Sequence, residues 1–128
     1  MEIRNEFKVT AKYLRENPNY IFVFGDNRGR EGYAGAAALR DEPNTYGFIT
    51  VKNLYSAEPS YTPANYISDY LTEITILRHK IINNPDKIFL ISKVGAGIAN
   101  KYGIWEEVIE PTLPIFLMDL ENVVLLWS

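Results

Sequence analysis

Two short apolar runs restrict the fold of this chain more than any other feature. They are YIFVFG at Tyr20–Gly25 and KIFLIS at Lys87–Ser92, both rich in β-branched and aromatic residues and bounded by turn residues. Continuous apolar runs of this kind are typical of strands buried on both faces, as in parallel sheets. Weaker runs at Gly47–Lys52 and Asn122–Leu126 predict two further strands.

Helical patterns separate these strands. The clearest begins at Pro63, with Thr62 as the predicted N-cap, and continues to about Asn83. Shorter helices are predicted at Thr10–Asn17, Ala34–Arg40 and Ile104–Leu117, the last broken or kinked by Pro111 and Pro114. The alternation predicts an α/β fold, with three α/β/α layers around a mostly parallel central sheet. A chain of 128 residues suits one domain, which we place at 1–128.

The composition narrows the classes of function. A formal net charge of -3 argues against an extended surface for nucleic acid but permits a small anionic ligand held locally. The chain has no cysteine and one histidine, which excludes cysteine-based and multi-histidine metal sites, and no metal or cofactor is predicted. It also has neither a signal-peptide pattern nor an apolar run of membrane-spanning length, so we expect a cytoplasmic protein without membrane partners.

Glycine-rich loops follow two of the predicted strands. The first is VFGDNRGREGYAGAAALR at Val23–Arg40, and the second is VGAGIANKYG at Val94–Gly103. Glycines let backbone amides approach a ligand closely, and a helix that begins near Ala34 would direct its free amides to the same place. The alternative is a tight turn whose alanines only pack a helix on the sheet. Two loops at neighbouring strand ends favour a binding site for an anion.

Several polar residues near the strand ends are candidates for chemistry. Lys52 could act as a nucleophile, or be a solvated lysine that ends a strand. Asp26 could act as a general base or bind a hydroxyl, or make an Asx turn. Asn27 can both donate to and accept from a ribose hydroxyl. Arg28 and Arg30 suit a phosphate, or are ordinary surface charges.

The order of these motifs resembles that of the macrodomains, the α/β domains that bind ADP-ribose, and of their compact phage and bacterial relatives. In those relatives a strand ends in Phe-Gly-Ser-Asn, a Gly-Arg-His-Gly-Ala-Gly-Ala-Ala loop follows, and a Pro-Thr-Lys strand end and an Ile-Gly-Cys-Gly loop come later. Here FVFGDN, RGREGYAGAAAL, GFITVK and ISKVGAGIANKYGIW stand in that order, within about Tyr20–Leu126. The branch that contains terminal ADP-ribose protein glycohydrolase is the most similar, through ITVK, PSY and GAG followed by Trp105.

The resemblance implies a small nucleotide ligand such as ADP-ribose. Gly25, Asp26 and Asn27 would lie near the distal ribose. In the glycohydrolase branch a strand-end lysine attacks the ribose anomeric carbon, and Lys52 matches it if Val51 is an added residue; Asp26 is the candidate for an assisting carboxylate. The first loop would hold the diphosphate through Gly32, Tyr33, Ala34, Gly35 and Ala36, and the second would close over it through Val94, Gly95, Ala96, Gly97, Ile98 and Ala99.

The sequence also departs from that branch. The position of the assisting aspartate falls on Ala99, and the N-terminal strand and Gly-Asp segment of larger macrodomains are missing. Binding is therefore better supported than catalysis. Three functions stay open: binding of ADP-ribose or a related metabolite, ADP-ribosyl glycohydrolase activity through Lys52, and a protein-interaction role, for an unknown partner, on a macrodomain scaffold that has lost its pocket.

Overall fold

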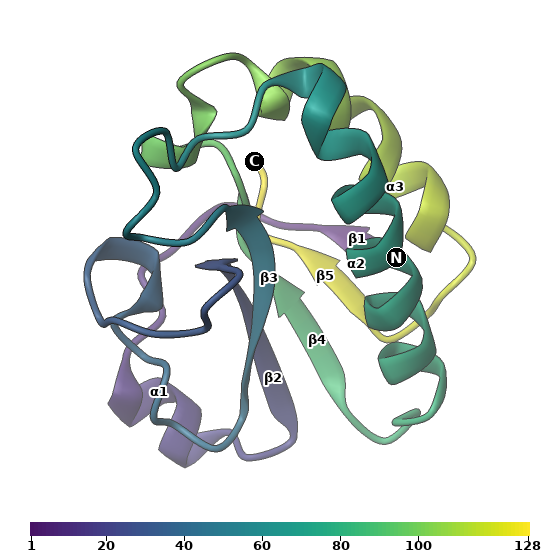
Figure 1. Ribbon diagram of the computed structural model, residues 1–128. Helices are drawn as coiled ribbons and strands as arrows, with labels where there is room; N and C mark the ends of the chain where they lie inside the picture. Colours follow the sequence, from purple (N-terminus) through teal and green to yellow (C-terminus); the bar gives the residue numbers. More distant parts are fainter.

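The apolar runs form the strands of one parallel sheet. The computed structural model describes Met1 to Ser128 and contains five strands in the order β1-β5-β4-β2-β3, each parallel to its neighbours (Figure 1). The strands are β1 (Glu2–Ile3), β2 (Tyr20–Asn27), β3 (Thr45–Val51), β4 (Ile88–Ile91) and β5 (Val123–Leu125). The four strands and the α/β class predicted from the sequence are confirmed.

Strand β1 was not predicted from the sequence. This strand pairs Glu2 with Val124 and Ile3 with Leu125 of β5. Two residues are too few for the alternation by which a strand is recognised in a sequence. The pairing continues beyond β1, where the Glu6 amide donates to the Ser128 carbonyl at 2.9 Å.

Three α-helices connect the strands: α1 (Ala11–Glu16), α2 (Pro63–Ile82) and α3 (Glu110–Leu117). Helix α2 begins as predicted, since the Thr62 side chain accepts from the Asn65 amide at 3.2 Å and the Asn65 side chain accepts from the Thr62 amide at 2.8 Å. This reciprocal capping satisfies two amides that a helix start leaves free. A π-helical turn at Trp105–Ile109 leads into α3, which contains both Pro111 and Pro114, so the helix is not broken at either proline and its irregular turn lies before them.

The helix predicted at Ala34–Arg40 is wrong. Only Gly35–Ala37 forms a single 3₁₀ turn. Ala34 has no side chain that can cap a helix, and Gly35 has a φ of +57°, which interrupts helical geometry at its start. A helix dipole therefore contributes nothing to the first loop, and any anion there must be held by individual peptide groups.

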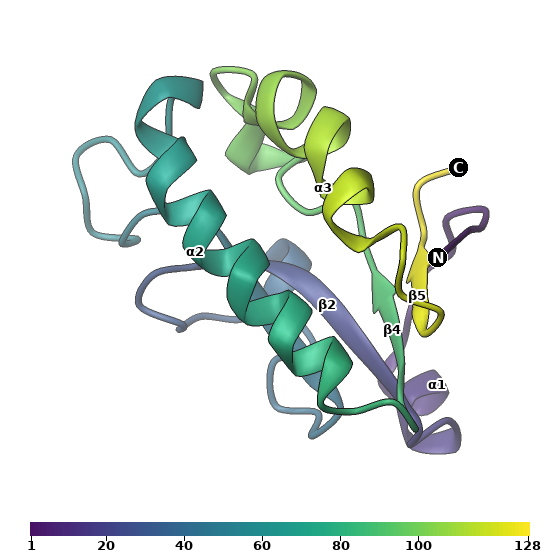
Figure 2. The same cartoon turned by 90° about the vertical axis from the view of Figure 1, so that its right-hand side faces the viewer.

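The sheet has helices on both faces, which gives the predicted three layers (Figure 2). The larger core lies under α2 and α3, where Val23, Phe89, Ile91 and Leu125 of the strands are buried. The strand residues that point the other way, Leu90 and Val124, pack with Val9, Leu14 and Leu126 in a smaller core under α1. The second face is thus only partly covered, because α1 is short.

Candidate functional site

The two glycine loops meet at the carboxyl ends of β2 and β4. A Cβ atom placed on Gly25 would lie 3.7 Å from the Gly95 amide nitrogen and 3.2 Å from Thr50 Oγ1. At Gly95 a Cβ would lie 2.5 Å from Ile109 Cδ1, and its φ of +86° also favours glycine. The starts of the two loops therefore lie next to each other, and Gly95 is needed for this close approach.

The first loop presents a row of unused backbone amides. None of the five amides of Gly32–Ala36 donates a hydrogen bond within the protein, and all of these residues are exposed. Gly32 and Gly35 have positive φ angles of 87° and 57°, and a Cβ on Gly35 would meet nothing within 4 Å. Successive free amides are the groups from which anion-binding concavities are built in proteins. We call Gly32–Ala36 the amide cradle.

A cavity of about 640 Å³ adjoins the amide cradle. The residues that line it include Gly35 and Ala36 of the cradle, Phe22 and Phe24 of β2, and Phe7 in the segment before α1. The volume is within the range of pockets for small ligands. The sequence prediction did not include Phe7, because the charged Glu6–Thr10 segment reaches the cavity only through the pairing of β1 with β5.

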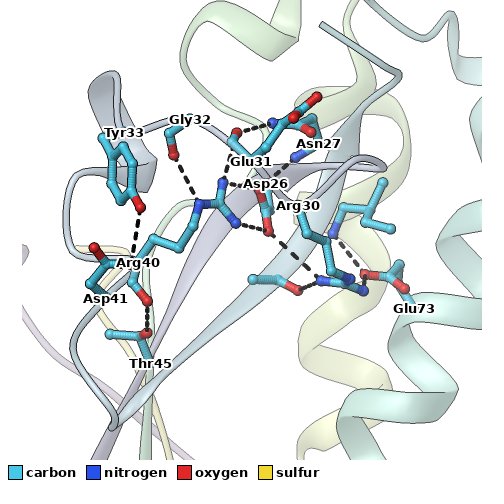
Figure 3. Close-up of polar contacts among 12 residues, drawn as sticks. Asp26, Asn27, Arg30, Glu31, Gly32, Tyr33, Arg40, Asp41, Thr45 and Glu73 are labelled. Carbon is cyan, nitrogen blue, oxygen red and sulfur yellow. Dashed lines mark hydrogen bonds and ion pairs between the residues drawn. The ribbon is translucent and has the colours of Figure 1, made fainter.

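Asp26 is buried at the end of β2 and is bound by Arg40 (Figure 3). Its Oδ1 accepts from Arg40 Nη2 at 2.5 Å and its Oδ2 from Arg40 Nη1 at 2.9 Å. A Cβ on Gly47 would overlap the Asp26 carboxylate, so glycine at this position of β3 leaves the space that the ion pair occupies. A catalytic role for Asp26 would require this ion pair to open.

A second arginine links the first loop to α2. Arg30 Nη1 donates to the Gly47 carbonyl at 2.7 Å, and Arg30 Nη2 lies 3.6 Å from Glu73 Oε1. Glu73 also accepts from the Ile49 amide at 2.7 Å, and the Ile49 carbonyl accepts from the Tyr66 hydroxyl. Burial raises the pKa of Glu73 above its usual value, although the Ile49 amide and Arg30 oppose this. Arg30 therefore holds the loop against β3 and α2 and is not a free phosphate contact.

Asn27 has one polar atom without a partner. Its Nδ2 donates to the Glu31 carbonyl at 2.9 Å, which orients the amide, whereas its buried Oδ1 accepts no hydrogen bond. Buried polar atoms are usually paired, so Asn27 Oδ1 is an unused acceptor in the free protein. A ligand hydroxyl is a suitable donor for this oxygen.

Lys52 lies just past β3, where its amide donates to the Pro59 carbonyl at 2.8 Å. Its Nζ is 5.6 Å from the centroid of the Tyr61 ring and forms no ion pair with a carboxylate. The Tyr61 hydroxyl donates to Asp69 at 2.6 Å, and burial together with this carboxylate raises the pKa of Tyr61. Lys52 is thus held over an aromatic ring at the edge of the site.

The second loop has a buried part and an exposed part. Val94, Gly95 and Ala99 are buried, whereas Gly97 and Ile98 are exposed and Ala96 is intermediate. Ile98 is 95% exposed, an unusual position for a large apolar side chain. Of the predicted second-loop residues, Ala96, Gly97 and Ile98 are therefore the ones that a ligand can reach.

A family model described as a family of unknown function (DUF7831) matches residues 4–100. The chain belongs to this family. The DUF7831 match includes β2, β3, α2, β4 and both glycine loops through Asn100. No curated protein and no solved structure matches the chain. Membership of DUF7831 therefore assigns no activity.

None of the helices combines the length and the apolar character that crossing a membrane requires.

Proposed function

We propose that this chain is a macrodomain-like domain that binds ADP-ribose or a related nucleotide metabolite. The observation that carries the proposal is the continuity between the amide cradle and the cavity, since Gly35 and Ala36 belong to both. A nucleotide needs this combination: amides for its phosphates and an apolar space for its base. The open cavity favours binding over a protein-interaction role on a scaffold that has lost its pocket.

Each part of such a ligand has a matching group. The diphosphate would accept hydrogen bonds from the amides of Gly32–Ala36, and the base would lie in the cavity against Phe7, Phe22 and Phe24. A ribose hydroxyl would donate to the unpaired Oδ1 of Asn27. The order of the sequence motifs supports the same ligand, by resemblance.

Calorimetric titration with ADP-ribose, AMP and NAD tests the proposal. We expect the wild type to bind ADP-ribose with micromolar affinity. We expect Gly35→Asp to lose this binding, because the substitution places a negative charge within the amide cradle. Gly35→Asn is the matched control, because asparagine has the same shape without the charge and both residues tolerate a positive φ. Absence of heat with all three ligands would overturn the proposal, as would equal affinities of the two variants.

Glycohydrolase activity through Lys52 is the second candidate. It is favoured by the position of Lys52 at the carboxyl edge of the sheet without an ion-pair partner. The β2–β3 register shifts between Asp26 and Asn27, so Thr50 is an unmatched residue of β3 two positions before Lys52. The expected result is release of ADP-ribose from an ADP-ribosylated substrate by the wild type, and binding without release by Lys52→Ala. Wild-type protein that binds ADP-ribose but releases none would leave binding as the function.

A further inference from the structure

Arg40 is bound on all sides by the first loop and the end of β2 (Figure 3). Besides its two bonds to Asp26, Arg40 donates from Nε to the Gly32 carbonyl at 2.8 Å and from Nη2 to the Glu31 carbonyl at 3.1 Å. Four of its five N–H groups are therefore used within the protein. Its guanidinium carbon also lies 5.5 Å from the centroid of Phe24, a wall of the cavity.

These bonds fix the direction of two amides in the cradle. In a planar trans peptide the carbonyl and the following N–H point in opposite directions. The Glu31 carbonyl belongs to the same peptide group as the Gly32 amide, and the Gly32 carbonyl to the same group as the Tyr33 amide. Because both carbonyls point toward Arg40, the amides of Gly32 and Tyr33 point away from it, and neither has a partner in the protein.

We infer that Arg40 is the positioning residue of the amide cradle: it orients the amides of Gly32 and Tyr33 so that both can bind one phosphate. The inference rests on the proposed function for the identity of the ligand. Arg40 itself acts from behind the loop, since its charge is already neutralised by Asp26. An arginine that contacted the phosphate would instead keep its fork free.

The arrangement requires a guanidinium. A lysine at this position would keep a positive charge beside Asp26, but its single ammonium group does not present the planar fork that reaches two carbonyls and a carboxylate together. Arg40→Lys therefore removes the orientation of the loop while it leaves the buried carboxylate paired. Arg40→Ala creates a space that free guanidinium ions can fill.

The test measures both the affinity for the ligand and the conformational order of the loop backbone. We would measure the dissociation constant for ADP-ribose and the NMR order parameters of the Gly32 and Tyr33 amides without ligand. The matched control is Arg78→Ala, because Arg78 also binds a carboxylate with two bonds of 2.7 Å, to Asp119 on the far side of the sheet. Guanidinium would be added to Arg40→Ala at concentrations far below those that unfold proteins.

In Arg40→Lys we expect affinity to fall about 10- to 100-fold, the equivalent of one charged hydrogen bond, and both amides to lose order. Arg78→Ala should change neither quantity, and guanidinium should restore order to Arg40→Ala. Wild-type affinity or wild-type order in Arg40→Lys would overturn the inference. If the wild type binds no nucleotide, the proposed function fails, whereas the order parameters still decide whether Arg40 orients the amides.

Discussion

At the scale of single residues, the site depends on glycines whose neighbours occupy the space of a side chain. The Asp26 carboxylate fills the space beside Gly47, and Ile109 fills the space beside Gly95. A polar cluster and a helix can therefore approach the strand ends closely. Gly47 and Gly95, which lie outside the cradle, thus contribute to the site through packing.

We expect Gly47→Ala to lower the free energy of unfolding by about 1 to 3 kcal/mol, because the new methyl group must displace the buried ion pair of Asp26 and Arg40. Urea denaturation of Gly47→Ala, Asp26→Ala and the double variant measures the coupling. If the overlap with the Asp26 carboxylate is the cause, Gly47→Ala should lower the free energy of unfolding much less in the Asp26→Ala protein than in the wild type. Additive losses in the double variant would contradict this explanation.

At the scale of elements, α2 both covers the core and closes the edge of β3. Glu73 and Tyr66 of this helix bind the Ile49 amide and carbonyl, and Arg30 binds the Gly47 carbonyl. The short segment at Ser60 forms an antiparallel bridge with Val51. The helix thereby fixes the strand from which Lys52 emerges.

Glu73 should make stability depend on pH. Because burial raises its pKa in the folded protein, the native state binds this proton more tightly than the unfolded chain does. The protonated Glu73 side chain therefore contributes its full stability at pH values below its pKa in the unfolded chain. This contribution is lost as the pH rises through the pKa of Glu73 in the folded protein.

We expect the free energy of unfolding of the wild type, minus that of Glu73→Gln, to fall as the pH rises above the ordinary glutamate pKa of about 4.3. Urea denaturation at a series of pH values measures this difference. The Ile49 amide, Arg30 and Asp26, which also influence the pKa of Glu73, are present in both proteins, so the subtraction isolates Glu73. A difference that does not change with pH would contradict the prediction.

At the scale of the whole molecule, the two ends of the chain lie side by side and together hold one wall of the cavity. Arg4 donates to Leu125 at 2.9 Å, and Ser128 donates to Arg4 at 3.1 Å. The Glu6–Thr10 segment, which lines the cavity, follows directly. The proposed base-binding wall therefore depends on contacts between residues far apart in the sequence.

Deletion of Met1–Asn5 should weaken ADP-ribose binding while the rest of the domain stays folded, because both residues of β1 are exposed and, of the deleted residues, Met1 alone packs against the larger core. Calorimetry measures the affinity and circular dichroism the fold. Arg4→Ala is the matched control, since it removes an exposed side chain and keeps the backbone pairing. Unchanged affinity in the truncated protein would show that the wall does not need β1.

The sequence predicted the elements whose residues repeat regularly and missed the contacts between distant residues. Apolar runs revealed β2 to β5, and the three- and four-residue spacing with Thr62 revealed α2. The spacing of glycines indicated where the loops meet. Nothing local indicated that Arg40 binds Asp26, because an isolated arginine and aspartate fourteen positions apart form no pattern. The alanines after Gly35 suggested a helix by propensity alone, and the backbone at Gly35 prevented it.

The closed edge of β3 has a consequence for how copies of this protein meet. An open strand edge is a template on which another chain can add its own strand, and the process can repeat into fibres. Here the outward groups of Gly47 and Ile49 are already bonded to Arg30, Glu73 and Tyr66. Strand-by-strand polymerisation through β3 is therefore blocked, and copies of the protein can associate there only after α2 has moved away.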